Sequence, residues 1–418
     1  MGSPRNRKIS RGLRSQTPCA SSPRTELNPP AISDAEYAQR REALAAGLEA
    51  ARLDALCVFY PARVAWLTGF HHIPTERPIA AVLDCDGFCT LVVPAVEKEH
   101  AESVPGLDRV DVYFEYPGDR HPMETVKDAL GQLQARRVAA DHDGYIEYWG
   151  YRGPRLSDLL VARPADGEML IESLRRVKSA AELACLQVSA DWASRAHHAM
   201  QAAIRPGRTE MECYGEPAAH TLEDMIREMP GWRPRRFASS GLTCMFVGGK
   251  KTAMPHGFVR GHGLQAGDVL VSGAGADLDG YSSELERTMI IGEPADAQRQ
   301  AFAAMLALQD RAFEVMKPGV PIGQVELEVI EVAHELGHAR HLRHHVGHSI
   351  GLEVHEAPFL DRGETDALEP GMVFSVEPGI YLPELGGFRH SDTVVITEDG
   401  CRLLTDYPRD LEALVIAP

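Results

Sequence analysis

The sequence lacks the segments that would direct the chain to a membrane or to nucleic acid. No apolar run approaches the roughly 18 to 20 residues of a transmembrane helix, and the basic N-terminus has no apolar signal-peptide core. Positive charge is also in deficit, since 43 lysines and arginines face 60 aspartates and glutamates, for a formal net charge of −17. Nucleic acids and anionic lipid surfaces both require clustered positive charge. The sequence therefore predicts a cytoplasmic protein with neither a nucleic-acid nor a membrane partner.

Cysteines are few and scattered. The eight cysteines include one close pair, Cys85 and Cys89. A zinc site would need a second such pair, and the sequence has none. Several lie within apolar runs, as buried free thiols do in a reducing compartment. A chain of 418 residues buries enough apolar surface to fold without disulfides or a structural metal.

The pattern along the chain predicts a flexible tail over residues 1–30 and two domains. Residues 31–168 alternate short strands with helical stretches and indicate an α/β domain, whereas residues 169–418 mix strands, glycine turns and helices and indicate an α+β domain. The expected elements are a helix from Asp34, strands at 54–60, 64–67, 79–83, 90–94, 138–141 and 159–161, a helix over 173–200 with a capping box at Ser179 and Glu182, and a helix over 295–315.

Histidines and carboxylates concentrate in a few short segments of the C-terminal domain. These are residues 254–257, 280–288, 345–358, 374–379 and 388–392. Each segment also has a purely structural explanation. Glu284 and Glu286 are two positions apart on a predicted strand, so both could point to one exposed face. His348 and His355 flank an apolar run and could be hydrogen-bonded core histidines. Together, ionisable groups at the ends of glycine-bounded strands are typical of a catalytic or metal-binding cleft.

These segments resemble the creatinase, prolidase and aminopeptidase P superfamily. The motifs that carry the resemblance are Pro-His-Gly, Gly-Tyr-x-Ser-x-x-x-Arg-Thr, Gly-His-x-Ile-Gly-Leu-x-Val-His-Glu-x-Pro and Pro-Gly-Met-Val-Phe-Ser-Val-Glu-Pro-Gly-Ile-Tyr, within a match over residues 35–418. The resemblance implies a small α/β N-terminal domain, an α+β catalytic domain of the pita-bread fold, and a homodimer.

The peptidases of this superfamily hold two divalent metals with two aspartates, one histidine and two glutamates. At the matching positions this chain has Gly273, Glu284, His348, Glu377 and Ser391. Glycine has no side chain and a neutral serine hydroxyl is a poor ligand for hard cations, whereas two bridged metals need several carboxylates. The set therefore predicts a site without metal or other cofactor.

Creatinase, the member that works without metal, shares further features with the chain. His256 and Glu286 are thirty residues apart, as are its catalytic histidine and guanidinium-binding glutamate, and Arg77 precedes a proline as its carboxylate-binding arginine does. The resemblance thus implies a metal-independent hydrolase acting on a C–N bond of a small amidine, guanidino or cyclic amidine carboxylate. The residues expected in catalysis are His256, Glu286, Glu377, His348 and His355, and those expected to bind substrate are Arg77, Tyr281, Glu284 and Arg389.

Two other functions stay open. One is an Xaa-Pro dipeptidase or aminopeptidase with an atypical single-metal site, in which Glu284, His348 and Glu377 hold one Mn²⁺ or Zn²⁺. The other is an inactive peptide-binding module, against which the retained set of His256, Glu286 and Glu377 argues. A second histidine group over residues 338–345 has no interleaved cysteine or carboxylate and is interpreted as a solvated Arg/His-rich stretch.

Overall fold

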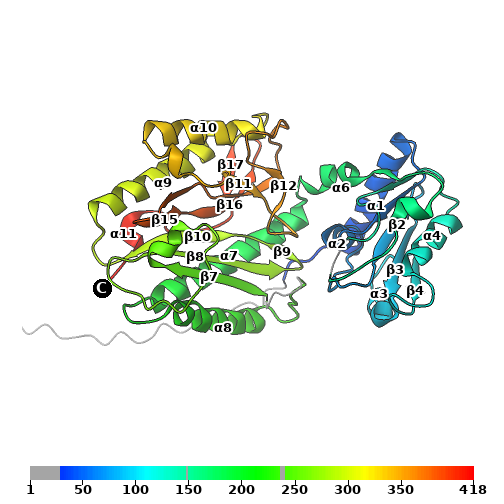
Figure 1. Ribbon diagram of the computed structural model, residues 1–418, viewed down its shortest axis with the longest axis horizontal. Coiled ribbons are helices and arrows are strands. Elements are labelled where there is room, and N and C mark those ends of the chain that lie inside the picture. The colour runs from blue at the N-terminus through cyan, green and yellow to red at the C-terminus, as the bar shows by residue number, and fades with distance from the viewer. Residues whose placement is uncertain (1–28, 147–148, 236–240) are drawn as a thin grey trace, which may run out of the picture.

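The computed structural model describes residues 29–418 apart from 147–148 and 236–240. Most of the predicted tail lies outside the described residues. The chain forms two bodies that lie side by side (Figure 1). The first body, which is the N-terminal domain, is built from the following elements. They are α1 (Asp34–Ala50), β1 (Ala55–Val58), α2 (Pro61–Thr68), β2 (Ala80–Asp84), β3 (Cys89–Pro94), η1 (Ala95–Glu97), α3 (Lys98–Glu102), β4 (Arg109–Tyr113), α4 (Pro122–Gln132), β5 (Val138–Ala140), α5 (Leu156–Leu159), β6 (Ala165–Asp166) and α6 (Glu168–Arg175).

The first body is a mixed sheet between two helical layers. Its strand order is β4-β3-β2-β1-β5-β6, with β1 antiparallel to β2 and parallel to β5. Alternate residues of β1 face opposite layers: Leu56 and Val58 pack with α1 and α2, whereas Ala55 and Cys57 pack with α4. Both faces of the sheet are therefore buried, as its short and nearly continuous apolar strands require.

The segment Val64–Leu67 is helical, so the prediction of a strand there is wrong. It lies within α2, which has Pro61 in its first turn and ends at Gly69, a glycine in the left-handed region with φ of 77°. These two residues are the usual start and stop signals of a short helix. The strand expected over 159–161 is also wrong, because Leu159 is the last residue of α5.

The second body is formed by the remaining elements. They are α7 (Ala180–Ala203), α8 (Glu210–Glu228), β7 (Leu242–Gly248), η2 (Gly249–Ala253), β8 (Val269–Leu278), β9 (Tyr281–Ser282), β10 (Leu285–Ile291), α9 (Asp296–Val315), α10 (Ile322–Glu335), η3 (Ala339–His341), β11 (Gly347–Ser349), β12 (Glu356–Phe359), β13 (Val373–Val376), β14 (Gly379–Leu382), β15 (Gly386–Arg389), β16 (Ser391–Ile396), β17 (Cys401–Leu403), α11 (Leu411–Leu414) and β18 (Val415–Ile416). The predicted division between residues 168 and 169 stays a prediction.

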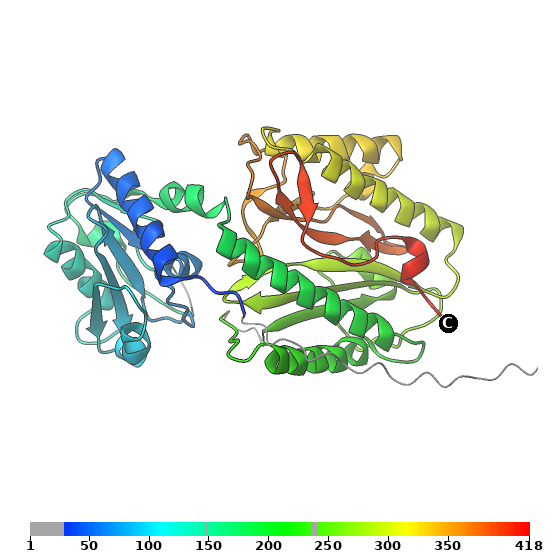
Figure 2. The same ribbon diagram turned by 180° about the vertical axis from the view of Figure 1, so that it is seen from behind.

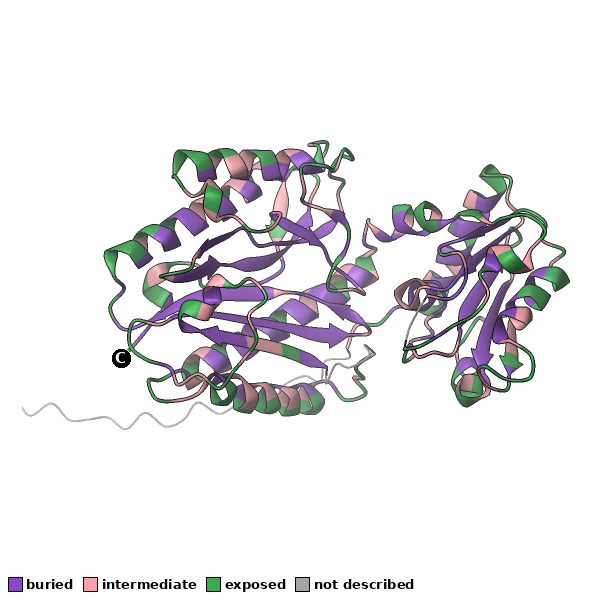
Figure 3. Cartoon of the chain, viewed as in Figure 1, coloured by how far each residue is buried: buried purple, intermediate pink, exposed green. Residues whose placement is uncertain are grey.

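One large antiparallel sheet organises this body. Its main path runs β12-β11-β13-β16-β10-β8-β7, and the helices α7, α8, α9 and α10 surround it. The view from behind shows α7 lying across the back of the sheet (Figure 2). Most strand residues are buried, apart from parts of peripheral strands such as β7 and β17, whereas the helices expose their outer faces (Figure 3). The expected α/β domain followed by an α+β domain is confirmed.

A capping box starts α7 where the sequence places it. The Ser179 hydroxyl accepts a hydrogen bond from the Glu182 backbone N–H, and the Glu182 carboxylate accepts one from the Ser179 N–H. Glu182 also accepts a 2.7 Å hydrogen bond from the Tyr281 hydroxyl and lies 3.2 Å from the Arg40 guanidinium of α1. This buried group therefore joins the start of the second body to the first, N-terminal body. Among the described residues, no helix is long and apolar enough to cross a membrane.

Candidate functional site

Neighbouring strands of the large sheet bring three predicted residues together. Glu284 directly precedes β10, His348 lies in β11, and Glu377 directly follows β13. The strands β11, β13, β16 and β10 are consecutive in the sheet, and His348 is the register partner of Ser375. Glu284 and Glu377, which are 93 positions apart in the sequence, therefore converge with His348 because their strands lie in one sheet.

His348 presents one ring nitrogen to the two carboxylates. Its Nε2 lies 3.4 Å from Glu377 Oε1 and 4.0 Å from Glu284 Oε2. The ring is fully buried, and Nε2 has no hydrogen-bond partner among the described residues. Nδ1 lies 3.1 Å from the Ser349 carbonyl oxygen, to which it can donate, so Nε2 is the ring nitrogen that faces the carboxylates. A metal-binding histidine is oriented by the same kind of second contact.

Two serine hydroxyls fix the orientation of Glu284. The hydroxyls of Ser375 and Ser391 each donate to Glu284 Oε1 at 2.9 Å, and the two hydroxyl oxygens are 2.7 Å apart. Oε1 is thus held by the sheet, while Oε2 is the oxygen that faces His348. The structure therefore places Ser391 in contact with a predicted ligand.

Arg389 forms a forked ion pair with Glu286. Its Nε and Nη2 lie 2.5 Å and 2.7 Å from the two carboxylate oxygens, and both side chains are buried. Nη1 donates to the Pro255 carbonyl and to the Tyr381 hydroxyl. Both oxygens of Glu286 are therefore occupied by a guanidinium of the chain itself, and Glu286 is not free to hold a cationic substrate group.

We call Glu284, Glu286, Glu377, His348 and Arg389 the carboxylate cluster. Its electrostatics follow from burial and from the crowding of like charges. Burial raises the pKa of Glu284, and the nearby carboxylate of Glu377 raises it further. Burial opposes ionisation of Glu377, but the contact with His348 and the charge of Arg389 lower its pKa to about 2. Burial lowers the pKa of His348, yet Glu377 and Glu284 outweigh it and raise that pKa to about 9. The cluster therefore attracts positive charge.

His355 and His256 lie at the outer side of the cluster. The His355 ring stacks on that of His348 with centroids 3.8 Å apart. Desolvation and then the charge of His348 lower the pKa of His355 to about 4, so its ring is neutral near pH 7. His256 is exposed, and it contributes to the lowered pKa of His355.

Two predicted substrate-binding residues lie elsewhere in this chain. The Tyr281 side chain is buried against Glu182 in the interdomain group described above. Arg77 lies in the N-terminal domain, where it pairs with Glu76 and with Glu115 at 2.7 Å each. Neither residue contacts the Glu284, His348 and Glu377 side chains, and a role of Arg77 in a partner's cleft stays a prediction.

Sequence reasoning missed a buried charged group behind the site. Glu356 accepts 2.7 Å and 2.9 Å hydrogen bonds from Lys178 and Arg175, and Lys178 also donates to the Ser349 hydroxyl at 3.0 Å. Glu356 and Ser349 directly follow His355 and His348 in the chain. The sequence signal that could have indicated this group is the position of Glu356 directly after His355 in the Gly-His-x-Ile-Gly-Leu-x-Val-His-Glu motif.

The second histidine group divides in the structure. His344 Nε2 lies 2.7 Å from the Tyr381 hydroxyl, which itself accepts from Arg389, so His344 belongs to the site. His338 and His341, both half-buried, contact each other through their Nδ1 atoms at 3.3 Å. The interpretation as a solvated stretch therefore fails for His344, because the chain turns inward before β11.

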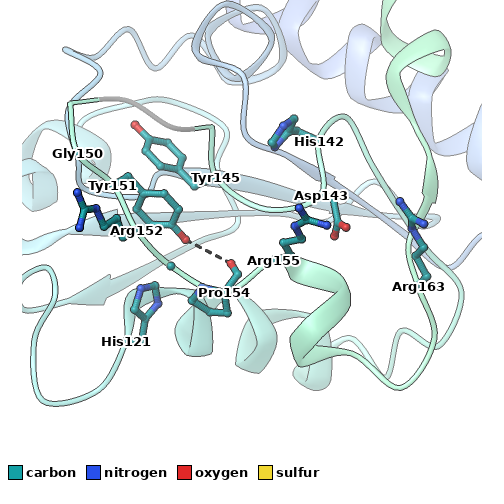
Figure 4. Close-up of a pocket in the computed structure, with 11 residues that line it drawn as sticks. His121, His142, Asp143, Tyr145, Gly150, Tyr151, Arg152, Pro154, Arg155 and Arg163 are labelled. Atoms are coloured by element: carbon teal, nitrogen blue, oxygen red, sulfur yellow. Dashed lines mark hydrogen bonds between the residues drawn. The ribbon is translucent and has the colours of Figure 1, made fainter.

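A separate cavity of about 1220 Å³ lies in the N-terminal domain (Figure 4). Its lining includes Arg152, Arg155 and Arg163, with Asp143 between the last two in the close-up. The Asp143 carboxylate accepts hydrogen bonds from the Ser157 backbone N–H and hydroxyl. This cavity shares no residue with the carboxylate cluster.

Comparison with known proteins identifies the family. The sequence model of metallopeptidase family M24 matches residues 184–398, and that of the creatinase/prolidase N-terminal domain matches residues 40–177. The chain belongs to metallopeptidase family M24. The recognised superfamily and the pita-bread fold are thereby confirmed.

Relatives in the M24 family are named as dipeptidases. The chain is 33% identical to a probable dipeptidase PepE of Mycobacterium bovis over 90% of this chain and 97% of that protein. It is 32% identical to an Xaa-Pro dipeptidase of Pyrococcus furiosus over 58% of this chain and 66% of that protein. The crystal structure of dipeptidase PepE from Mycobacterium ulcerans superposes with a TM-score of 0.77 at 31% identity, covering 93% of this chain and all of that one.

These findings correct the expected activity. A hydrolase is supported, but a metal-independent hydrolase of amidines or guanidines is not, since these M24 relatives are named as dipeptidases. The pairing of Glu286 with Arg389 supplies a physical reason, because it removes the carboxylate that would hold the amidine.

The expectation of a site without metal is also wrong. The family is described as metallopeptidases, and ligand atoms of Glu284, His348 and His355, as well as those of Glu284, Glu286 and Glu377, lie within 4.8 Å of one another. Carboxylate oxygens and imidazole nitrogens at this spacing are suited to a divalent metal ion.

Proposed function

We propose that the chain is a metal-dependent peptidase that hydrolyses the C–N bond before proline in short Xaa-Pro peptides. The observation that carries the proposal is the buried Nε2 of His348, which faces Glu284 and Glu377 and has no hydrogen-bond partner among the described residues. The name of the Pyrococcus furiosus relative, an Xaa-Pro dipeptidase, supports the substrate class, and that of the Mycobacterium bovis relative supports a dipeptidase.

The residues present suit one divalent ion. A buried imidazole nitrogen without a hydrogen bond is costly, and coordination satisfies it. Glu284, His348 and Glu377 form a two-carboxylate, one-histidine set, which leaves coordination positions for water and substrate. A divalent ion held there would polarise the scissile carbonyl oxygen and make a water molecule more acidic.

The surrounding side chains perform the remaining tasks. The neutral His355 ring can accept a hydrogen bond at the outer side of the cluster, and the exposed His256 can carry a proton to the departing proline nitrogen. The serine contacts hold Glu284 in one orientation, so little rearrangement is needed during turnover. The anionic cluster attracts the ammonium group of a free peptide N-terminus.

The direct test is a peptide panel assayed with metal-free protein before and after addition of Mn²⁺ or Zn²⁺. Ala-Pro and Leu-Pro should be cleaved only after metal is added, whereas Ala-Ala and Pro-Ala should resist. Ala-Pro-Ala separates an aminopeptidase, which cleaves it, from a dipeptidase, which does not. Failure to cleave any Xaa-Pro peptide with either metal would refute the proposal. His220→Ala, at an exposed position on α8, is the control for purification and handling.

A further inference from the structure

We propose that this M24 site is mononuclear, and that the guanidinium of Arg389 takes the place of the second metal ion on the Glu286 carboxylate. The inference rests on the proposed metal-dependent function and specifies how many ions it uses. It departs from the two-metal arrangement that the family resemblance implies. Four features of the described residues carry it.

The first feature is the position of a carboxylate, which lies on β10 beside residue 273 and not on residue 273 itself. Gly273 in β8 is the direct register partner of Glu286 in β10. A Cβ at position 273 would lie 2.7 Å from Met245 Cγ and 3.2 Å from Glu286 Cγ, so these two side chains fill the space that a residue 273 side chain would need. Met245 in β7 is the other register partner of Gly273. Position 273 therefore carries no carboxylate, and its register partner Glu286 supplies one.

The second feature is the cation already bound to that carboxylate. Arg389 contacts both Glu286 oxygens, and its remaining nitrogen is fixed by the Pro255 carbonyl and the Tyr381 hydroxyl. The forked geometry of arginine and carboxylate is rigid and strong. The guanidinium already compensates the charge of Glu286, so a second cation gains less from binding that carboxylate.

The third feature is the replacement at position 391. A neutral hydroxyl stands there, and Ser391 donates to Glu284 Oε1 instead of offering a carboxylate to metal. Ser375 donates to the same oxygen. Glu284 therefore has one oxygen, Oε2, that faces His348, whereas Oε1 is held by two hydroxyl donors of the chain.

The fourth feature is the balance of formal charge. With Glu284, Glu286 and Glu377 ionised and His348 neutral, as a metal ligand must be, the single charge of Arg389 leaves two negative charges in the cluster. One divalent ion neutralises them. A second divalent ion would leave two uncompensated positive charges at buried side chains, which is strongly unfavourable.

The experiment counts ions on the full-length protein. Chelator-treated protein is dialysed against graded Mn²⁺, and bound manganese is measured by elemental analysis and by electron paramagnetic resonance. We expect saturation at one Mn²⁺ per chain, with the spectrum of isolated spins. Saturation at two ions with an exchange-coupled spectrum would overturn the proposal, and so would the absence of any bound ion.

Two variants at Arg389 test the substitution of guanidinium for metal. Arg389→Met frees Glu286, whose ligand atoms lie within 4.8 Å of those of Glu284 and Glu377, and should allow a second Mn²⁺ to bind. Arg389→Lys keeps a positive charge and should remain at one ion. A folded Arg389→Met protein that still saturates at one ion would contradict the proposal.

A third variant keeps the test decisive if Arg389→Met does not fold. Glu286→Gln should still bind one Mn²⁺, because Glu286 is not a ligand in the proposed site, whereas His348→Ala should lose Mn²⁺ binding. Loss of binding in Glu286→Gln would overturn the proposal. If the protein bound one ion but cleaved no Xaa-Pro peptide, only the proposed function would be refuted. If it bound two ions and cleaved these peptides, only the proposal of a mononuclear site would be refuted.

Discussion

The Lys178 ammonium lies 2.7 Å from the Glu356 carboxylate, and both side chains are buried. Lys178 belongs to the segment between α6 and α7, and Glu356 is the first residue of β12. This ion pair therefore connects the segment between the two domains to the strand that follows His355. Lys178 also reaches the Ser349 hydroxyl, so the same ammonium supports the strand that carries His348.

The first prediction concerns the pH dependence of stability. Burial opposes ionisation of Glu356, but the charges of Lys178 and Arg175 outweigh it and lower the pKa below its ordinary value. The stabilisation is therefore fully present above the unfolded-state pKa of about 4.3 and is lost as the pH falls through the lower folded-state pKa. Glu356→Gln should cost about 3–5 kcal/mol of unfolding free energy at pH 7, because it leaves buried cations without this partner.

Denaturant unfolding at pH 7 and near pH 4 measures this effect. The loss caused by Glu356→Gln should shrink at the lower pH, because the Glu356 carboxyl of the unfolded chain is then partly protonated while that of the native chain, whose pKa is lower, is still ionised. Glu384→Gln is the matched control, because Glu384 pairs with Lys250 at 2.9 Å on the open surface and should not alter stability measurably. An equal loss at both pH values would contradict the ionic origin of the stabilisation.

The second prediction compares two proposed metal ligands. Glu284→Gln and His348→Ala should each weaken Mn²⁺ binding by a similar factor, because each removes a ligand from a set of three. Calorimetric titration of chelator-treated protein gives both dissociation constants. If Glu284→Gln bound Mn²⁺ as tightly as the unaltered chain, Glu284 would be a supporting residue and not a ligand.

The third prediction concerns proton transfer by His256. This residue is exposed and follows Pro255, so its removal should leave the thermal midpoint unchanged. His256→Ala should lower kcat by about 10²–10⁴-fold, the usual contribution of a positioned acid or base. The variant should still bind one Mn²⁺. A fall in metal content parallel to the fall in kcat would show that His256 supports the metal site instead.

The fourth prediction concerns assembly. We expect a homodimer in which Arg77 reaches the cleft of the partner, because Arg77 lies in the N-terminal domain and does not contact the cluster of its own chain. Light scattering should give twice the 45.8 kDa chain mass. Mixed dimers of Arg77→Ala and His348→Ala chains should recover part of the activity. An active monomer would refute this arrangement.

Local signals in the sequence predicted much of the fold. The Ser179 and Glu182 capping box formed as expected because all of its hydrogen bonds join residues three positions apart. The prediction of a strand at Val64–Leu67 failed because a short apolar run is compatible with either a strand or a helix. Its flanking Pro61 and Gly69 were the signals that decide for a helix.

The sequence by itself determined the family and the types of side chain available to the site. Glu284, His348 and Glu377 could be located from motifs, since each motif is contiguous in the chain. Only the tertiary structure decided what those side chains do to one another. The pairing of Gly273 with Glu286 depends on strand register, and the contact of Arg389 with Glu286 joins residues more than a hundred positions apart. No local pattern encodes such contacts, because they arise when the whole sheet forms.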